Sequence, residues 1–130
     1  MSEEKILLAE PVIPKKETIA LTKKVLDDNF PNEGKYTKLF ENKLSKLLNV
    51  RYVVTSTSGT ISIFLALKAV GIKKGDEIII PNLTFPATAN AVMLAGGKPV
   101  LVDVDKKNLL INEINLLQKI TKKTNKSLWI

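Results

Sequence analysis

Residues 53–105 read VVTSTSGTISIFLALKAVGIKKGDEIIIPNLTFPATANAVMLAGGKPVLVDVD. This stretch alternates between β-branched apolar runs and segments whose apolar residues recur at helical spacing. The same alternation continues to the end of the chain. It predicts strands over 52–56, 76–82, 98–105 and 127–130, separated by helices over 60–71, 86–97 and 112–123.

The predicted strands are apolar along their length, which indicates burial on both faces. Strands that are joined through helices run parallel, with right-handed crossovers. The sequence therefore predicts an α/β fold with a parallel, helix-covered sheet. Two amphipathic helices are expected before it, over 14–29 and 35–50, with a turn between them.

The composition excludes several kinds of chemistry. The 130 residues include no cysteine and no histidine, so disulfides, thiolate metal sites and a histidine base are absent. The N-terminal residues MSEEKILLAEPVIPKK have acidic residues near the start and no long apolar run. They therefore resemble neither a signal peptide nor a membrane span. We expect a cytoplasmic protein without a membrane partner.

The formal net charge of +7 raises the question of nucleic-acid binding. The lysines occur singly or in pairs along the whole chain, with acidic residues among them. Dispersed lysines are typical of a solvated surface, and the aromatic residues of a single-strand platform are lacking. The sequence therefore favours no nucleic-acid partner.

Small hydroxyl residues surround a glycine between the first predicted strand and its helix, over 55–60. Ser58, Gly59 and Thr60 would present N–H groups and hydroxyls at the positive end of a helix dipole, which suits a phosphate. The alternative is a capped helix that binds no ligand. Neither the P-loop motif G-x-x-x-x-G-K-[ST] nor the dinucleotide-binding motif G-x-G-x-x-G occurs in the chain. The sequence therefore disfavours an NTPase or a dinucleotide dehydrogenase.

The ends of the next two predicted strands carry further candidates. Phe85 lies on the loop before a helix that Pro86 can start, where its ring could stack on a planar ligand or instead close the core as a hydrophobic staple. Asp103 and Asp105 follow the third predicted strand. We interpret this pair as turn and cap residues and assign no metal site.

The motifs of residues 53–105 resemble the DegT/StrS family of pyridoxal-phosphate-dependent sugar aminotransferases, which act on nucleotide-linked keto-sugars. Residues 34–50, GKYTKLFENKLSKLLNV, resemble the same family, with a similarity to perosamine synthases. The resemblance implies the N-terminal part of the large domain of a fold type I transferase. It divides the chain into an N-terminal helical segment, 1–50, and the first part of a cofactor-binding domain, 51–130.

The resemblance also implies roles for individual residues. The turn that matches Ser58, Gly59 and Thr60 holds the phosphate of pyridoxal 5'-phosphate in the family, and the aromatic residue that matches Phe85 stacks on the pyridine ring. Family proteins are usually homodimers with active sites between subunits. Asn32 and Tyr36 are the substrate-binding candidates in the segment that would lie near such a site.

The family's Schiff-base lysine and the acid that pairs with the pyridinium nitrogen lie downstream of the matched region, so no catalytic residue is nominated. The resemblance therefore implies a truncated or split chain that is not an active aminotransferase alone. Two alternatives stay open, both without catalysis. One is a module that binds a phosphorylated ligand, and the other is a partner or sensor subunit that pairs with a complete homologue.

Overall fold

The computed structural model describes residues 9–28, 34–122 and 124. The chain divides into two compact units, Met1–Val54 and Thr55–Ile130. The first unit holds the helices α1 (Lys15–Asp27) and α2 (Lys35–Leu48), as the spacing predicts. Neither helix buries a residue. Helix α2 ends at Asn49, which has the left-handed conformation typical of a helix C-terminus.

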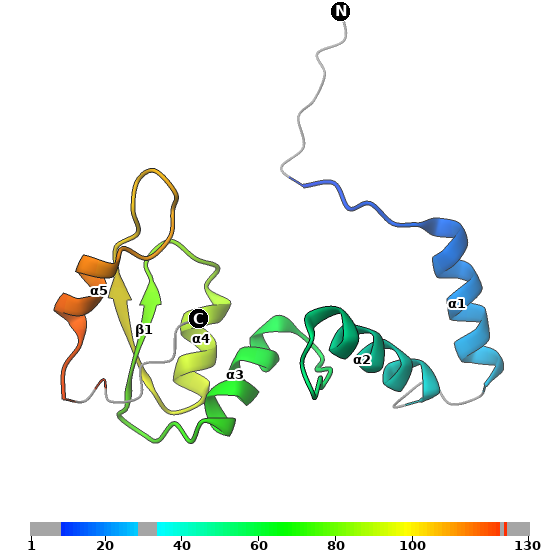
Figure 1. Cartoon of the computed structure of the whole chain (residues 1–130), viewed down its shortest axis with the longest axis horizontal. Coiled ribbons are helices and arrows are strands. Elements are labelled where there is room, and N and C mark those ends of the chain that lie inside the picture. Colours follow the sequence, from blue (N-terminus) through cyan, green and yellow to red (C-terminus); the bar gives the residue numbers. More distant parts are fainter. Residues whose placement is uncertain (1–8, 29–33, 123, 125–130) are drawn as a thin grey trace, which may run out of the picture. The chain divides into compact units, whose positions relative to one another are not determined.

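The second unit is built around a parallel two-stranded sheet (Figure 1). Strand β1 (Glu77–Pro81) pairs with β2 (Lys98–Val102) in a register that places Ile79 opposite Val100. Helix α4 (Ala87–Leu94) connects the two strands. Helix α3 (Gly59–Ala69) precedes the sheet and α5 (Glu113–Lys119) follows it.

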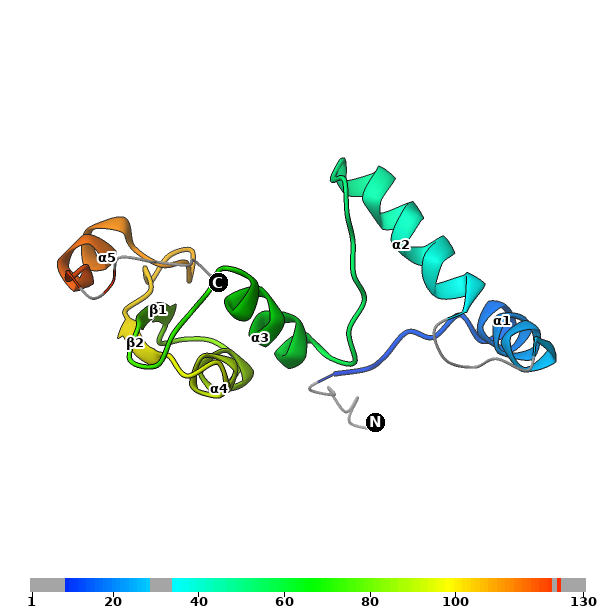
Figure 2. The same ribbon diagram turned by 90° about the horizontal axis from the view of Figure 1, so that it is seen from below.

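Helices cover both faces of this sheet, because successive strand residues point to opposite faces. Ile78 and Ile80 pack with Leu67 of α3 and Val92 of α4 in one core cluster. Ile79 packs on the other face with Val102 and Leu116, the latter from α5. Figure 2 shows the same arrangement end-on, with α5 on one side of the strands and α3 and α4 on the other.

The turn from α4 into β2 requires close packing and a left-handed residue. Gly96 has φ +91°, and the N–H of Gly97 donates to the carbonyl of Val92 at 3.0 Å, which closes the helix end. A side chain at Gly97 would come within 2.7 Å of the Ile78 side chain. The two glycines thus let the chain turn from α4 directly into β2.

The α/β class and the parallel sheet are confirmed, but the first predicted strand is wrong. Residues 52–56 form no strand. An extended segment becomes a strand only when a neighbouring strand pairs with it, and within the described ranges the sheet consists of β1 and β2. The predicted strand over 127–130 lies outside the described residues.

Candidate functional site

Helix α3 starts at the hydroxyl-rich segment that the sequence singles out. Ser58 has an extended backbone, with φ −165° and ψ 163°, and its Oγ accepts a hydrogen bond from the Ile61 N–H at 3.3 Å. The Ser58 carbonyl accepts the first helical bond, from the Ser62 N–H at 2.9 Å. Ser58 is therefore a helix cap, as the simpler interpretation predicts.

Capping does not use all the donors at this helix start. The N–H groups of Gly59 and Thr60 and the hydroxyl of Thr60 have no acceptor within the described part of the chain. Because the Ser58 Oγ only accepts in its cap bond, its own hydrogen also stays available. A Cβ on Gly59 would meet nothing within 4 Å, so the space in front of this turn is open. These donors lie at a helix N-terminus, where the helix dipole favours an anion.

Two more serines hold this turn in place. The Ser56 Oγ lies 2.6 Å from the Ser62 Oγ and 3.1 Å from the Ser58 carbonyl oxygen. The Ser62 Oγ lies 3.2 Å from the same carbonyl. Sequence reasoning missed Ser62, although its spacing of four residues from Ser58 places it one helical turn along on the same face.

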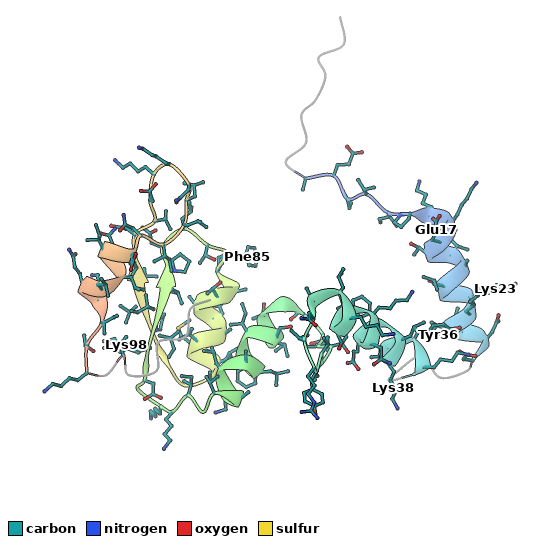
Figure 3. The ribbon with its side chains drawn as sticks, in the orientation of Figure 1. Glu17, Lys23, Tyr36, Lys38, Phe85 and Lys98 are labelled. Carbon is teal, nitrogen blue, oxygen red and sulfur yellow. The ribbon has the colours of Figure 1, made fainter. Side chains whose placement is uncertain are left out.

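Phe85 lies on the loop between β1 and α4 and does not close the core. Its side chain is 78% exposed, so the hydrophobic-staple alternative is wrong. Figure 3 shows the ring pointing away from the sheet. Pro86 has helical dihedrals directly before Ala87, and the N–H of Thr88 donates to the Phe85 carbonyl at 3.1 Å, so the loop is fixed while the ring stays exposed.

The carboxyl ends of the two strands are tied together by polar bonds. The Asn82 N–H donates to the Val102 carbonyl at 2.9 Å, and the Asn82 side-chain amide donates to the Asp103 carboxylate. Asp105 accepts from the N–H of Lys107 at 2.7 Å, as a turn residue does. Among the described residues, no group of three acidic, histidine or cysteine side chains gathers as a metal site would require.

Ser58, Gly59 and Thr60 thus lie together, and Phe85 belongs to the same unit. Helices α3 and α4 pack side by side, and Figure 1 shows both beginning on the side toward which the strands run. This is the edge of a parallel sheet at which α/β proteins bind ligands. Helices α3 and α4 therefore begin at the same edge of the second unit.

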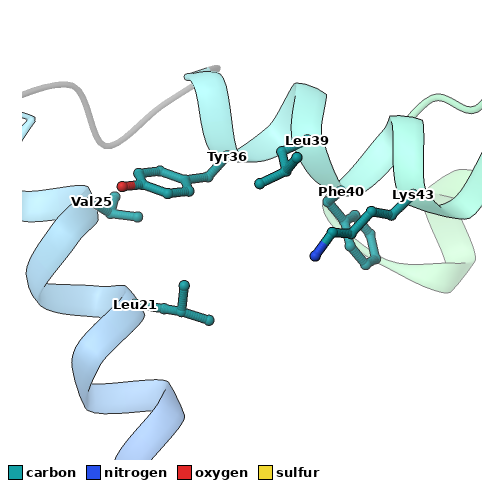
Figure 4. A pocket seen from close by; sticks show the side chains of 6 residues that line it. All are labelled: Leu21, Val25, Tyr36, Leu39, Phe40 and Lys43. Carbon is teal, nitrogen blue, oxygen red and sulfur yellow. The ribbon is translucent and has the colours of Figure 1, made fainter.

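The remaining candidates belong to the first unit. Tyr36 is half-buried and lines an apolar hollow of about 220 Å³ between α1 and α2 (Figure 4). Asn32 lies outside the described residues. Substrate binding by either residue stays a prediction. The hollow is lined by Leu21, Val25, Tyr36, Leu39, Phe40 and Lys43.

Residues 13–130 match the family model of the DegT/DnrJ/EryC1/StrS aminotransferase family. The chain is 41% identical over 93 residues to GDP-perosamine synthase of Escherichia coli O157:H7. That alignment covers 72% of this chain and 26% of the synthase. The chain thus spans about a quarter of the length of this relative.

Solved structures similar to this chain are also aminotransferases or related enzymes, and the chain again covers only part of their length. The aminotransferase TlmJ from Streptoalloteichus hindustanus superposes with a TM-score of 0.83 at 28% identity, over 92% of this chain and 33% of TlmJ. The Escherichia coli GDP-4-keto-6-deoxy-D-mannose-3-dehydratase, solved with bound hydrated PLP, superposes with a TM-score of 0.76 at 28% identity, over 89% of this chain and 31% of the dehydratase. None of the helices in the described ranges combines the length and apolar character needed to cross a bilayer.

Proposed function

Because the chain belongs to the DegT/DnrJ/EryC1/StrS aminotransferase family, we propose that it forms the part of a sugar aminotransferase that holds the phosphate and the ring of pyridoxal 5'-phosphate. The enzyme would transfer an amino group from an amino acid to a nucleotide-linked keto-sugar, as a homodimer. Residues 1–50 would be its N-terminal helical segment and residues 51–130 the first part of its cofactor-binding domain. The expected cytoplasmic location stays a prediction.

The observation that carries the proposal is the donor set at the start of α3. The N–H groups of Gly59 and Thr60 and the hydroxyls of Ser58 and Thr60 can each donate to a phosphate oxygen. The helix dipole adds a favourable interaction with the anion. The open space at Gly59 allows the backbone to approach the ligand closely. The residues present therefore fit a phosphate ester.

Phe85 supports the second half of the proposal. Phe85 is 78% exposed on a loop that backbone hydrogen bonds fix, so its ring contributes little to the stability of the fold. The ring offers a flat apolar face to a planar heterocycle. When it is bound, pyridoxal 5'-phosphate supplies a carbonyl group and a conjugated ring that accepts electrons. The role of this chain's residues would be to hold and orient that group, and none of its lysines is assigned a catalytic role.

Ligand binding to the purified protein tests the cofactor site. Pyridoxine 5'-phosphate is a suitable probe because it has no aldehyde and so forms no imines with surface lysines. We expect calorimetry to show tighter binding of this ester than of inorganic phosphate. Phe85→Ala should weaken it about three- to tenfold by removing the stacked ring. Leu83→Ala, which truncates another exposed residue of the same loop, is the control and should have little effect.

Two results would contradict the proposal. If inorganic phosphate binds as tightly as the ester, the protein is a phosphate-binding module without cofactor recognition. If Phe85→Ala and Leu83→Ala have equal effects, the ring does not stack. Amino transfer itself is tested by incubating the cofactor-loaded protein with a nucleotide-linked keto-sugar and an amino acid. Mass spectrometry distinguishes an amino-sugar product from a dehydrated one, the latter indicating the reaction of the dehydratase relative.

A further inference from the structure

Two serine hydroxyls and one backbone carbonyl form a hydrogen-bonded cluster at the start of α3. The cluster joins Ser56 in the preceding segment, Ser58 at the cap and Ser62 in the first turn of the helix. The shortest contact is the 2.6 Å between the two hydroxyl oxygens of Ser56 and Ser62. Both hydroxyls also lie within hydrogen-bond distance of the Ser58 carbonyl oxygen, at 3.1 Å and 3.2 Å.

Each serine hydroxyl has a single hydrogen, which limits the arrangements that these contacts allow. If Ser62 donates to the Ser56 Oγ, then Ser56 donates to the Ser58 carbonyl. If Ser56 donates to the Ser62 Oγ, then Ser62 donates to that carbonyl. In either arrangement both hydrogens are used within the cluster, and the Ser58 carbonyl receives one of them in addition to the Ser62 N–H.

The Ser58 carbonyl matters because it shares a rigid plane with the N–H of Gly59. A trans peptide holds the C=O and the following N–H in opposite directions within one plane. Bonds that fix the direction of the Ser58 carbonyl therefore also fix the direction of the Gly59 N–H. That N–H is one of the donors with no acceptor in the described part of the chain.

We propose that Ser56 and Ser62 are positioning residues that orient the Ser58–Gly59 peptide toward the phosphate of the cofactor. The inference rests on the proposed function, since it takes the start of α3 as the phosphate site. Neither hydroxyl contacts the phosphate, because both hydrogens are used within the cluster. Their contribution is preorganisation, since an N–H that already points at the anion needs no reordering when the ligand binds.

The test compares two ligands that differ only in the phosphate. Pyridoxine 5'-phosphate and pyridoxine are titrated into the wild-type protein, Ser56→Ala and Ser62→Ala, and the ratio of the two affinities is measured. We expect the double variant Ser56→Ala/Ser62→Ala, which leaves the Ser58 carbonyl without a hydroxyl donor, to lower the ratio about three- to tenfold, the value of one hydrogen bond. Each single variant should lower the ratio less, because the remaining hydroxyl can still donate to that carbonyl.

A merely structural role predicts a different pattern. Ser62→Ala places a better helix former in α3 and should not reduce its helicity, so a lower phosphate affinity in this variant cannot come from a weaker helix. Ser45→Ala is the matched control, because it removes a hydroxyl that donates to the Val50 carbonyl at 2.6 Å in the first unit. This control should leave the ratio unchanged. Ser56→Thr, which keeps a hydroxyl at this position, should have the wild-type ratio.

The outcomes separate this inference from the one on which it rests. If the wild-type protein binds both ligands equally, the phosphate site is absent and both proposals fail. If the wild-type protein prefers the phosphate ester and the double variant keeps the wild-type ratio, only the positioning role is overturned. Unchanged circular dichroism spectra across the variants establish that each result refers to folded protein.

Discussion

The two units of the chain contrast in how they use their apolar residues. In the unit Met1–Val54, α1 and α2 bury none of theirs, and Ile19, Leu26 and Leu47 are each more than half exposed. In the unit Thr55–Ile130, the sheet residues Ile78 and Ile80 are fully buried. An amphipathic helix has one apolar stripe, which needs a partner surface, whereas a sheet between helices buries both of its faces. The second unit therefore supplies its own core.

The largest expected difference between the units comes from the same truncation made in each. Ile80→Ala removes a fully buried side chain next to Leu67 and Val92 and should destabilise the second unit by about 2–5 kcal/mol. Ile19→Ala removes a side chain that is 69% exposed and should change stability by less than about 0.5 kcal/mol. Hydrogen exchange read separately over each unit measures both effects. Equal losses would mean that the first unit has a core of its own.

A second pair of substitutions sharpens the contrast within the second unit. Gly97→Ala places a methyl group 2.7 Å from the Ile78 Cδ1 and 3.2 Å from the Val92 Cγ1, so we expect a loss of about 1–3 kcal/mol. Gly59→Ala meets nothing within 4 Å and lies in a helix, so stability should hold or rise by up to about 1 kcal/mol.

Ligand binding should reverse the order of these two variants. The methyl group at residue 59 would occupy the space in front of the anion donors, so Gly59→Ala should bind pyridoxine 5'-phosphate several-fold more weakly. Urea unfolding and calorimetry on the same preparations measure the two properties. A Gly59→Ala protein with full affinity would show that the phosphate does not approach the backbone at this turn.

Most elements of the second unit could be predicted from the sequence because their signals are local. The isoleucines of β1 and the capped start of α3 are local signals, so both elements could be predicted without knowledge of the rest of the fold. The strand expected over 52–56 fails because composition reports that a segment suits a strand, not that another strand lies beside it. Strand pairing is a non-local property.

The candidate site likewise has features that the local sequence predicts and features that it does not. Ser58 is predictable as a cap from its position before an apolar helix, and the structure confirms that bond. The exposure of Phe85 could not be predicted, because an aromatic residue before a helix suits a staple as well as a ligand site. The contact between Ser56 and Ser62 depends on the angle at which the chain enters α3, which no local pattern specifies.

Ion pairs give a smaller contrast between the units. In the second unit, the Glu77 side chain is only 14% exposed, lies 3.6 Å from the Lys98 ammonium and accepts from the Thr121 hydroxyl at 2.9 Å. Glu77→Gln removes its charge and should cost about 1 kcal/mol in urea unfolding. Asp28→Asn, the matched change in the first unit, breaks an ion pair whose carboxylate side chain is 35% exposed and should have a smaller effect. The reverse order would mean that exposure does not decide the strength of these pairs.

The smallest expected effect is a pH dependence in the first unit. The hydrogen bond from Lys35 to Asp28, at 2.9 Å, raises the pKa of Lys35 above its ordinary value of 10.5. A base whose pKa is raised by folding contributes its stabilisation in full below the ordinary value, and this contribution is lost as the pH rises through the folded value. The helix content of the first unit should therefore fall slightly above pH 10.5.

Circular dichroism across this pH range, compared among the wild-type protein, Lys35→Met and Lys38→Met, measures the effect. Lys38→Met removes a lysine of the same helix that has no ion pair with another described residue, so it should keep the wild-type pH dependence. Lys35→Met should lose it, and high salt should weaken it in the wild-type protein because exposed charges are screened. Identical profiles for the three proteins would show that this pair does not link α1 to α2. The apolar stripes of α1 and α2 would then be the main surfaces through which these two helices can pack.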